Sequence, residues 1–276
     1  MSSVLTLQLA GPLQSWGASA RFARRTTENA PTKSGVVGLL AAAKGLPRDA
    51  DLSELAALRF GVRIDQPGTR LRDFQTAHHA VTGASMPLSE RFYLADAVFV
   101  AAVEGGATLI DELHRAVANP AYLPYLGRRS CPPSRPVELA VHEDAALGDV
   151  LAAEPWRAAE WYQQRRRAES TVELSVLAEA GTADGWSGAG ARSGPSSASE
   201  PRPESAVLGD TIRDQPLSFD PRQRRFALRT VLTSLVTVPN PCAAAAHTRI
   251  PDPRGAAPAH DPISHLEHLE GVVRCT

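Results

Sequence analysis

The stretch FYLADAVFVAAV, residues 92–103, is apolar almost throughout, which is typical of a strand buried on both faces of a sheet. After it, LIDELHRAVAN at 109–119 carries apolar residues at helical spacing, and Thr108 stands where a helix cap is expected. PVELAVH, residues 136–142, then has the length and alternation of a short strand. Together these segments predict a strand–helix–strand unit.

A second unit of the same kind precedes the first. VLTLQLA, residues 4–10, alternates leucines with polar residues, which predicts a strand buried on one face. PTKSGVVGLLAAAKGL, residues 31–46, predicts a helix that either Thr32 or Ser34 can cap. LRFGVRID, residues 58–65, alternates again, with its apolar side chains expected to point inward.

The two units are separated by an irregular polar stretch, residues 66–91, rich in glycine, proline, histidine and arginine. The element order is therefore β-α-β, insertion, β-α-β, which predicts an α+β protein with a ferredoxin-like, RRM-type core in residues 1–147. Residues 148–238 predict a smaller, β-rich C-terminal part. It contains a mobile Gly/Ser/Pro-rich loop at 181–206, and a Pro/Ala-rich tail follows at 239–276.

Length and composition restrict the class of protein. The 276 residues contain no apolar run long enough for a membrane span, and the amino-terminal sequence lacks the pattern of a signal peptide. The cysteines, Cys131, Cys242 and Cys275, are odd in number and show no metal-binding spacing, which favours a reducing compartment. We therefore expect a cytoplasmic protein without a membrane anchor, a metal or another cofactor.

The net charge of −1 conceals an uneven distribution of basic residues. The first 48 residues carry six basic side chains against one acid, and 27 of the 29 basic residues of the chain are arginine. Arginine pairs with phosphate through two parallel hydrogen bonds and stacks on bases. The first part of the chain can therefore present a surface to a polyanion.

Aromatic residues accompany these arginines. Trp16 lies in a turn shortly before the basic loop RFARR, and two tyrosines precede Arg128 and Arg129 in the segment 120–132. Aromatic side chains that stack on bases, together with arginines that neutralise phosphates, are the usual means of binding single-stranded RNA. Side chains at the rim of the core beside surface arginines explain the same pattern, and composition does not decide between the two interpretations.

Motifs of the common enzyme classes are absent from the sequence, which has no Walker loop, dinucleotide fingerprint or GxSxG. His78 and His79 can be interpreted as the acid–base pair of a metal-independent ribonuclease, although adjacent histidines on an extended loop point apart. Lys33 and Ser34 lie at a predicted helix start, where N–H groups favour an anion, but an ordinary helix cap explains these residues as well.

Several segments resemble one known family. LQLAGPLQSWG (7–17), PTKSGVVGLLAAAKG (31–45), LRDFQT (71–76) and PAYLPYLGRRSCP (120–132) are similar to the CasD family of type I-E CRISPR Cascade surveillance complexes, within the RAMP superfamily. A weaker similarity is present at DQPLSFDPRQRRFALRTV (214–231). The order and spacing fit throughout the first 140 residues.

The resemblance implies a ferredoxin-like core and a non-catalytic, RNA-binding role in antiviral defence. A member of this family caps one end of Cascade, holds the 5′ handle of the CRISPR RNA, and joins the backbone subunit CasC and the large subunit CasA. A thumb-like hairpin inserted in the core packs against the backbone subunit, and residues 66–91 stand where that thumb is expected. Target DNA is then bound through the complex by pairing with the guide.

The resemblance also implies two groups of RNA-facing residues. Those in the first half of the core would line a handle pocket, supply charge and bind an anion: Gln14, Ser15, Trp16, Arg24, Arg25, Lys33, Ser34 and, at the base of the thumb, Arg72. Those in the later loop would form the opposing wall: Tyr122, Tyr125, Arg128, Arg129 and Ser130.

Two other functions stay open on the sequence. A related type I-C subunit is itself the endoribonuclease that processes the repeat, so this chain can be a metal-independent endoribonuclease that uses His78 or His79. A general module for single-stranded RNA, outside CRISPR systems, is the third interpretation.

Overall fold

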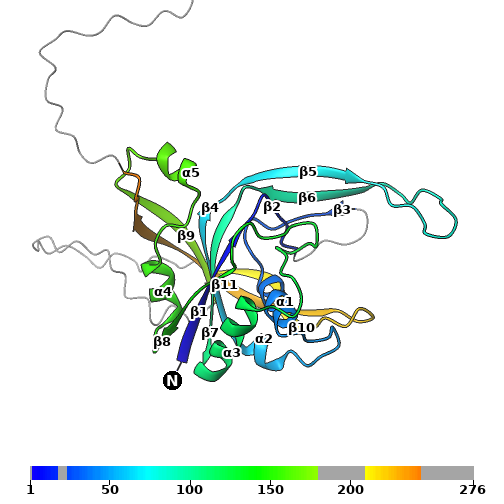
Figure 1. Cartoon of the computed structure of the whole chain (residues 1–276), viewed down its shortest axis with the longest axis horizontal. Coiled ribbons are helices and arrows are strands. Elements are labelled where there is room, and N and C mark those ends of the chain that lie inside the picture. Colours follow the sequence, from blue (N-terminus) through cyan, green and yellow to red (C-terminus); the bar gives the residue numbers. More distant parts are fainter. Residues whose placement is uncertain (1, 18–23, 180–208, 244–276) are drawn as a thin grey trace, which may run out of the picture. The chain divides into compact units, whose positions relative to one another are not determined.

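A computed structural model describes residues 2–17, 24–179 and 209–243, so the predicted loop at 181–206 and the tail beyond residue 243 lie outside these ranges. The described part is built on a seven-stranded antiparallel sheet in the order β10-β11-β9-β4-β7-β1-β8 (Figure 1). Its strands are β1 (Ser2–Ala10), β4 (Arg59–Gln66), β7 (Val98–Gly106), β8 (Glu138–Glu143), β9 (Thr171–Glu179), β10 (Gly209–Ser218) and β11 (Arg225–Pro239).

The predicted element order is present in the first half of this sheet. Strand β1 is followed by helix α1 (Lys33–Ala43) and β4, and β7 is followed by helix α3 (Ala107–Ala118) and β8. The four strands of these units are neighbours in the order β8-β1-β7-β4, and each pair is antiparallel. The predicted α+β class is confirmed. The predicted cap at Thr108 is wrong, because α3 begins at Ala107, two residues before the expected start, and Gly106 occupies the cap position.

Helices cover both faces of the sheet. Helices α1 and α3 pack with the leucines of β1 in one core cluster, and α4 (Leu147–Ala153) packs with Trp156 against the opposite face. Strand β1 is therefore buried on both faces, with Thr6 wholly enclosed and Gln8 nearly so. The expectation of a half-buried strand was wrong, because α4 and the segment after it cover the polar face of β1. The sequence pattern of that region did not predict that it would pack on the sheet.

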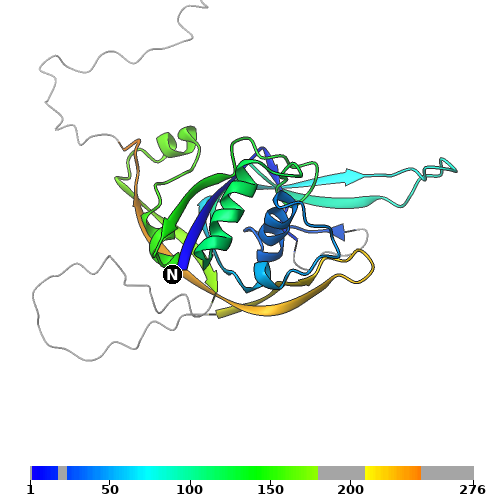
Figure 2. The same ribbon diagram turned by 60° about the horizontal axis from the view of Figure 1, so that its bottom comes forward.

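The apolar stretch 92–103 forms two strands instead of one. Strand β6 (Ser89–Ala95) is followed by Asp96, whose φ of 56° turns the chain before β7 begins. Strand β6 pairs with β5 (Thr69–Gln75) in a second sheet, which also contains the short strands β2 (Leu13–Gln14) and β3 (Arg24–Arg25). Strands β5 and β6 form a ribbon that projects from the large sheet (Figure 2).

The insertion at 66–91 was expected to be irregular, and this was wrong. Every residue of β5 is exposed, so the ribbon has no buried face to impose an alternation of apolar and polar residues. Its pairing is nevertheless regular, from Thr69 opposite Ala95 to Gln75 opposite Ser89. Backbone pairing, which the side-chain pattern does not encode, defines this hairpin.

The later strands extend the same sheet. Strand β9 pairs with β4, and β11 joins β9 to β10, so the sheet continues across the predicted boundary at residue 147. That boundary stays a prediction. The short helices α2 (Ser53–Ala57) and α5 (Glu160–Arg165) complete the described elements. None of the helices within the described ranges is long and apolar enough to cross a membrane.

An ion pair lies inside the sheet–α4 layer. Arg63 and Asp65 are both fully buried, and two hydrogen bonds of 2.7 and 2.9 Å join the guanidinium to the carboxylate. Arg63 also donates to the carbonyl oxygens of Leu151, Glu154 and Pro155. It therefore ties the end of α4 to β4. The alternation of LRFGVRID predicts that Arg63 lies on the face of β4 that points to solvent. In the structure that face is buried, because α4 packs on it.

Candidate nucleic-acid interface

Two sequence motifs far apart in the chain meet at one end of the sheet. The backbone N–H of Ser15 donates to the carbonyl oxygen of Leu126 at 3.1 Å. Gly127 has a φ of 83°, and a Cβ added there would lie 1.8 Å from the carbonyl oxygen of Ser15. The first turn and the loop 120–132 therefore form a single wall that admits no side chain at Gly127.

Gln14 and Trp16 hold this turn together from within. The Gln14 amide donates to the carbonyl oxygens of Leu9 and Ala97 at 2.9 and 2.8 Å, and its oxygen accepts the indole N–H of Trp16. Both side chains are wholly buried, and Trp16 packs so closely on Gly35 of α1 that a Cβ there would be 2.8 Å from the ring. Ser15 donates its hydroxyl to a backbone carbonyl of β6.

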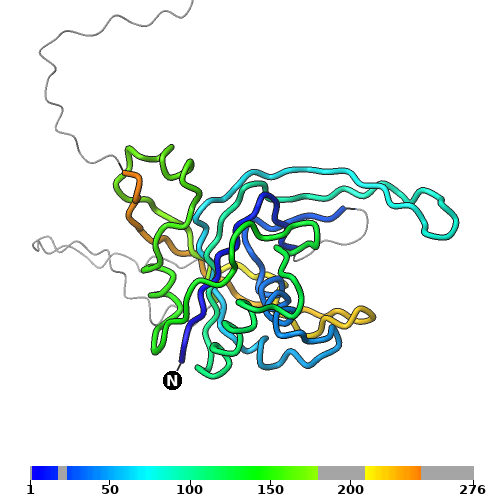
Figure 3. Tube along the Cα trace, viewed as in Figure 1, coloured from blue at the N-terminus to red at the C-terminus, as the bar shows by residue number. Residues whose placement is uncertain are grey.

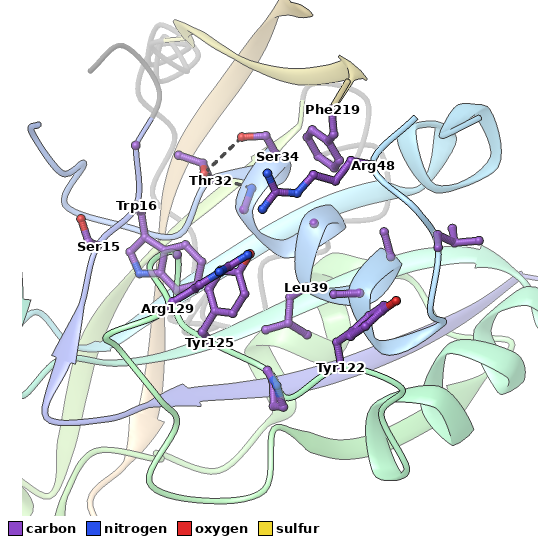
Figure 4. Close-up of a pocket in the computed structure, with 18 of the residues that line it drawn as sticks. Ser15, Trp16, Thr32, Ser34, Leu39, Arg48, Tyr122, Tyr125, Arg129 and Phe219 are labelled. Atoms are coloured by element: carbon purple, nitrogen blue, oxygen red, sulfur yellow. Dashed lines mark hydrogen bonds between the residues drawn. The ribbon is translucent and has the colours of Figure 1, made fainter. Parts of the chain in front are cut away.

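A pocket of about 840 Å³ opens beside this wall, around α1 (Figure 4). Four segments line it: the first turn, α1 with the residues just after it, the loop 120–132, and the β10–β11 hairpin. Its predicted members are Ser15, Trp16, Ser34, Tyr122, Tyr125 and Arg129. Three arginines and five aromatic residues contribute to the lining, and none of its described residues is acidic.

Arg48, Phe219, Arg224 and Phe226 belong to this lining and were missed in the sequence. Arg48 is exposed just after α1, and the two phenylalanine rings lie 6.2 Å apart on the hairpin. The segment SFDPRQRRF, 218–226, has the same combination of aromatic residues and arginines that drew attention to 120–132. That signal was available, but the hairpin joins the pocket only through the pairing of β10 with β11.

The start of α1 already holds an anion from within the chain. The backbone N–H of Lys33 donates to Asp214 at 2.7 Å, and the buried Lys33 ammonium lies 2.8 Å from Glu179. Arg229 pairs with the same Asp214 carboxylate. The predicted anion site is thus occupied by a strand of the C-terminal part. Thr32 is the helix cap, through its hydroxyl and the N–H of Gly35.

The adjacent arginines of the loop have different surroundings. The guanidinium of Arg128 lies 4.7 Å from the centre of the Tyr93 ring and donates to the carbonyl oxygen of Arg25 at 2.8 Å. Arg129 is exposed and lines the pocket, and Ser130 is exposed beside it. Cys131 is fully buried, and burial raises the pKa of its thiol, so this cysteine is a poor nucleophile.

A second basic group lies along the middle and outer part of the paired ribbon, away from its base at Thr69 and Ala95. Arg24 and Arg25 are exposed on β3, which runs parallel to β6. Arg72 on β5 pairs with Glu90 at 2.6 Å and lies over the Phe74 ring, and Arg24 approaches Glu90 at 3.9 Å. Glu90 therefore neutralises part of the charge that was predicted here.

The two histidines lie near the tip of the ribbon, in the turn that joins β5 to β6. The His78 ring contacts the carbonyl oxygen of Gly83 at 3.3 Å, and Nδ1 of His79 accepts the N–H groups of Val81 and Thr82. Both rings take part in the turn, and neither lines the pocket. Within the described ranges, histidine, cysteine and acidic side chains form no cluster of three or more that could hold a metal ion.

The pocket combines arginine and aromatic side chains, with no acid among its described lining residues, and these are the side-chain types that contact phosphates and bases. Comparison with known proteins defines the family. Residues 4–232 match the family model described as CRISPR-associated protein (Cas_Cas5), and the chain belongs to this family.

Individual relatives agree with this assignment and confirm the resemblance to the CasD family. The chain is 37% identical over 179 residues to the CRISPR system Cascade subunit CasD of Escherichia coli (strain K12), a match that covers 57% of this chain and 76% of the relative. A chain from a CRISPR RNA-guided surveillance complex is 29% identical, with a TM-score of 0.63 over 89% of this chain and 95% of its own length. A Cas protein crystal structure is 33% identical, with a TM-score of 0.58 over 87% and 97%.

Proposed function

We propose that the chain is a non-catalytic subunit of a type I-E Cascade complex and binds the 5′ handle of the CRISPR RNA in the pocket around α1. The observation that carries this proposal is the lining of that pocket: Arg48, Arg129 and Arg224 line it together with five aromatic residues, and none of the described lining residues is acidic. The E. coli relative is itself a Cascade subunit.

The chemistry of the lining suits a single strand of RNA. The exposed ring of Tyr122 and the partly exposed ring of Tyr125 offer faces on which bases can stack. Arg129, Arg48 and Arg224 carry guanidinium groups that pair with phosphates through two hydrogen bonds. At about 840 Å³, the pocket is in the range of sites that enclose a small ligand, so it can enclose part of a strand while the rest lies outside.

The surroundings divide the predicted residues by role. Those with open side chains in the pocket, or exposed on β3, on the ribbon and in the loop 120–132, are proposed to contact RNA: Arg24, Arg25, Arg72, Tyr122, Tyr125, Arg129 and Ser130. The others are proposed to position them, since their polar groups are engaged within the protein: Gln14, Ser15, Trp16, Lys33, Ser34 and Arg128.

The remaining parts of the proposal concern the scaffold and the partners. Strands β8-β1-β7-β4 with α1 and α3 are proposed to be a ferredoxin-like core, and the β5–β6 ribbon to be the thumb that packs against CasC. Apolar side chains exposed along the ribbon support that contact: Leu71, Phe74, Val81, Met86 and Leu88. Contact with CasA, indirect binding of target DNA and a cytoplasmic location complete the proposal.

Binding of a CRISPR RNA with its 5′ handle, measured by fluorescence anisotropy, tests the site. The variant Arg129→Ala/Arg224→Ala should bind at least about tenfold more weakly, because two phosphate contacts are lost. Arg115→Ala/Arg135→Ala removes the same charge from exposed residues outside the pocket and should bind normally. Equal affinities for the two variants would refute the assignment of the handle to this pocket.

The same RNA, extended by its unprocessed repeat, tests the absence of catalysis. Incubation in EDTA should leave the repeat intact. Site-specific cleavage that disappears in His78→Ala or His79→Ala would instead make the chain a metal-independent endoribonuclease. Equal affinity for unrelated single strands would favour a general RNA-binding module.

A further inference from the structure

The segment 154–169 carries a second group of aromatic and arginine side chains outside the pocket. It contains α5 (Glu160–Arg165), and the sequence WYQQRRR spans residues 161–167. Trp156 and Tyr162 pack in the core cluster of α4, on the face of the sheet opposite α1. Figure 3 shows this segment beside β9, well away from the β5–β6 ribbon. Neither the handle proposal nor the thumb accounts for it.

Hydrogen bonds fix this segment firmly to the sheet. The indole N–H of Trp156 donates to the carbonyl oxygen of Asp65 at 2.9 Å, and the backbone N–H of Ala159 donates to the side-chain oxygen of Gln66 at 3.0 Å, both on β4. Asn240, at the end of β11, donates to the carbonyl oxygens of Gln163 and Arg166. The helix is therefore held at both ends, and the side chains that it exposes are presented in a defined arrangement.

Trp161 is 51% exposed on this anchored helix. Its indole meets the Tyr162 ring edge to face, with 5.6 Å between the ring centres and 87° between the planes. This contact restrains the indole while leaving about half of the side chain open to solvent. Arg165 follows one helical turn later, so its guanidinium can reach the same face as the Trp161 ring.

The arginines of the segment divide into paired and unpaired groups. Arg166 pairs with Glu169 at 2.6 Å and lies over the Trp156 ring, and Arg157 pairs with Glu154. Arg165 and Arg167 are exposed and form no ion pair with any residue in the described ranges. Glu154 and Glu169 thus form ion pairs with the other two arginines. The guanidinium groups of Arg165 and Arg167 can therefore bind phosphates.

We propose that Trp161, Arg165 and Arg167 form a second nucleic-acid site, which binds a single strand with one base stacked on the indole and neighbouring phosphates on the two guanidinium groups. A restrained, exposed indole beside unpaired arginines is the combination that single-strand-binding proteins use. Arg165 at the end of α5 also suits the helix dipole, but the dipole accounts for neither Arg167 nor the exposed Trp161.

Binding of a short fluorescein-labelled oligothymidylate to the full chain tests this site. The measurement is made in the Arg129→Ala/Arg224→Ala background, so that binding in the pocket does not dominate. Trp161→Ala should weaken binding about 5- to 100-fold, through loss of the stacked base. Arg165→Ala/Arg167→Ala should reduce the slope of log K against log salt by about 1.4, because two phosphate contacts are lost.

Matched variants separate a specific site from general charge. Arg165→Lys/Arg167→Lys should keep the salt slope, and further introduction of Arg115→Ala/Arg135→Ala should leave affinity almost unchanged. An oligonucleotide with 5-bromouracil should cross-link to the peptide that contains Trp161. The proposal would be overturned if the Arg129→Ala/Arg224→Ala protein did not bind the oligonucleotide. It would also be overturned if adding Trp161→Ala or Arg165→Ala/Arg167→Ala left the affinity of that protein unchanged. The proposal would also be overturned if the α5 variants bound the oligonucleotide normally but no longer assembled with another protein subunit of the complex. That result would identify a protein-docking surface instead.

Discussion

The Cα of Gly127 lies against the backbone of Ser15, so that a Cβ on Gly127 would be 1.8 Å from the Ser15 carbonyl oxygen. This approach, with the hydrogen bond from Ser15 to Leu126, joins the first turn to the loop 120–132. The wall of the pocket that both segments form therefore depends on these two backbone contacts.

Gly127→Ala is expected to separate these segments. A side chain at a φ of 83° costs about 1–2 kcal/mol by itself, and the contact with Ser15 adds to this. Urea unfolding should show a loss of at least about 2 kcal/mol, and RNA affinity should fall with it. The control is Gly17→Ala, where an added Cβ meets no atom within 4 Å and stability should barely change. Similar stabilities for both variants would contradict the proposed joint.

Arg128 and Arg129 should respond differently to replacement by alanine. Arg129→Ala should weaken RNA binding and leave the free energy of unfolding nearly unchanged, since this side chain is exposed. Arg128→Ala should cost about 1–3 kcal/mol of stability, because it removes a hydrogen bond to Arg25 and a contact with the Tyr93 ring. Chemical unfolding and fluorescence anisotropy on the same samples check this. If Arg129→Ala lowered the stability and Arg128→Ala weakened only RNA binding, the loop would be arranged differently in solution.

Gly38→Ala should make the protein more stable and bind RNA less well. Alanine inside a helix is favoured over glycine by about 0.5–1 kcal/mol. The new methyl group would meet the Phe219 ring at an ordinary contact distance of 3.7 Å, on the wall of the pocket, and would narrow it. Thermal unfolding and RNA titration should therefore move in opposite directions. A more stable variant with unchanged affinity would show that RNA does not enter this part of the pocket.

Breaking the ion pair between Arg63 and Asp65 should be strongly destabilising. Asp65→Asn leaves the Arg63 charge buried without its partner, which costs about 3–5 kcal/mol. Arg63→Met/Asp65→Asn should recover part of this loss, although the carbonyl groups at the end of α4 lose their donor. A double-mutant cycle in urea measures the coupling. The surface pair Arg166–Glu169 is the control, and Glu169→Gln, which keeps Arg166 on the Trp156 ring, should leave the unfolding midpoint almost unchanged.

Local patterns predicted much of the scaffold. Apolar residues at helical spacing indicated α1 and α3, and alternation indicated β1 and β4, because these elements bury at least one continuous face. The same reasoning missed β10 and the regular pairing of β5 with β6. Strand β5 is exposed along its whole length, and its order comes from backbone hydrogen bonds that leave no trace in the side-chain pattern.

The sequence by itself determined the α+β element order, the abundance of arginine and the motifs that resemble the CasD family. Each of these can be read from composition or from residues that are neighbours in the chain. Only the tertiary structure decided what each charged side chain faces. Lys33 meets Glu179, Arg128 meets the Tyr93 ring, and Arg129 meets the pocket, although all three belong to basic motifs. The physical reason is that a charge acquires its role from its surroundings, and those come from strands distant in the chain that pairing brings together.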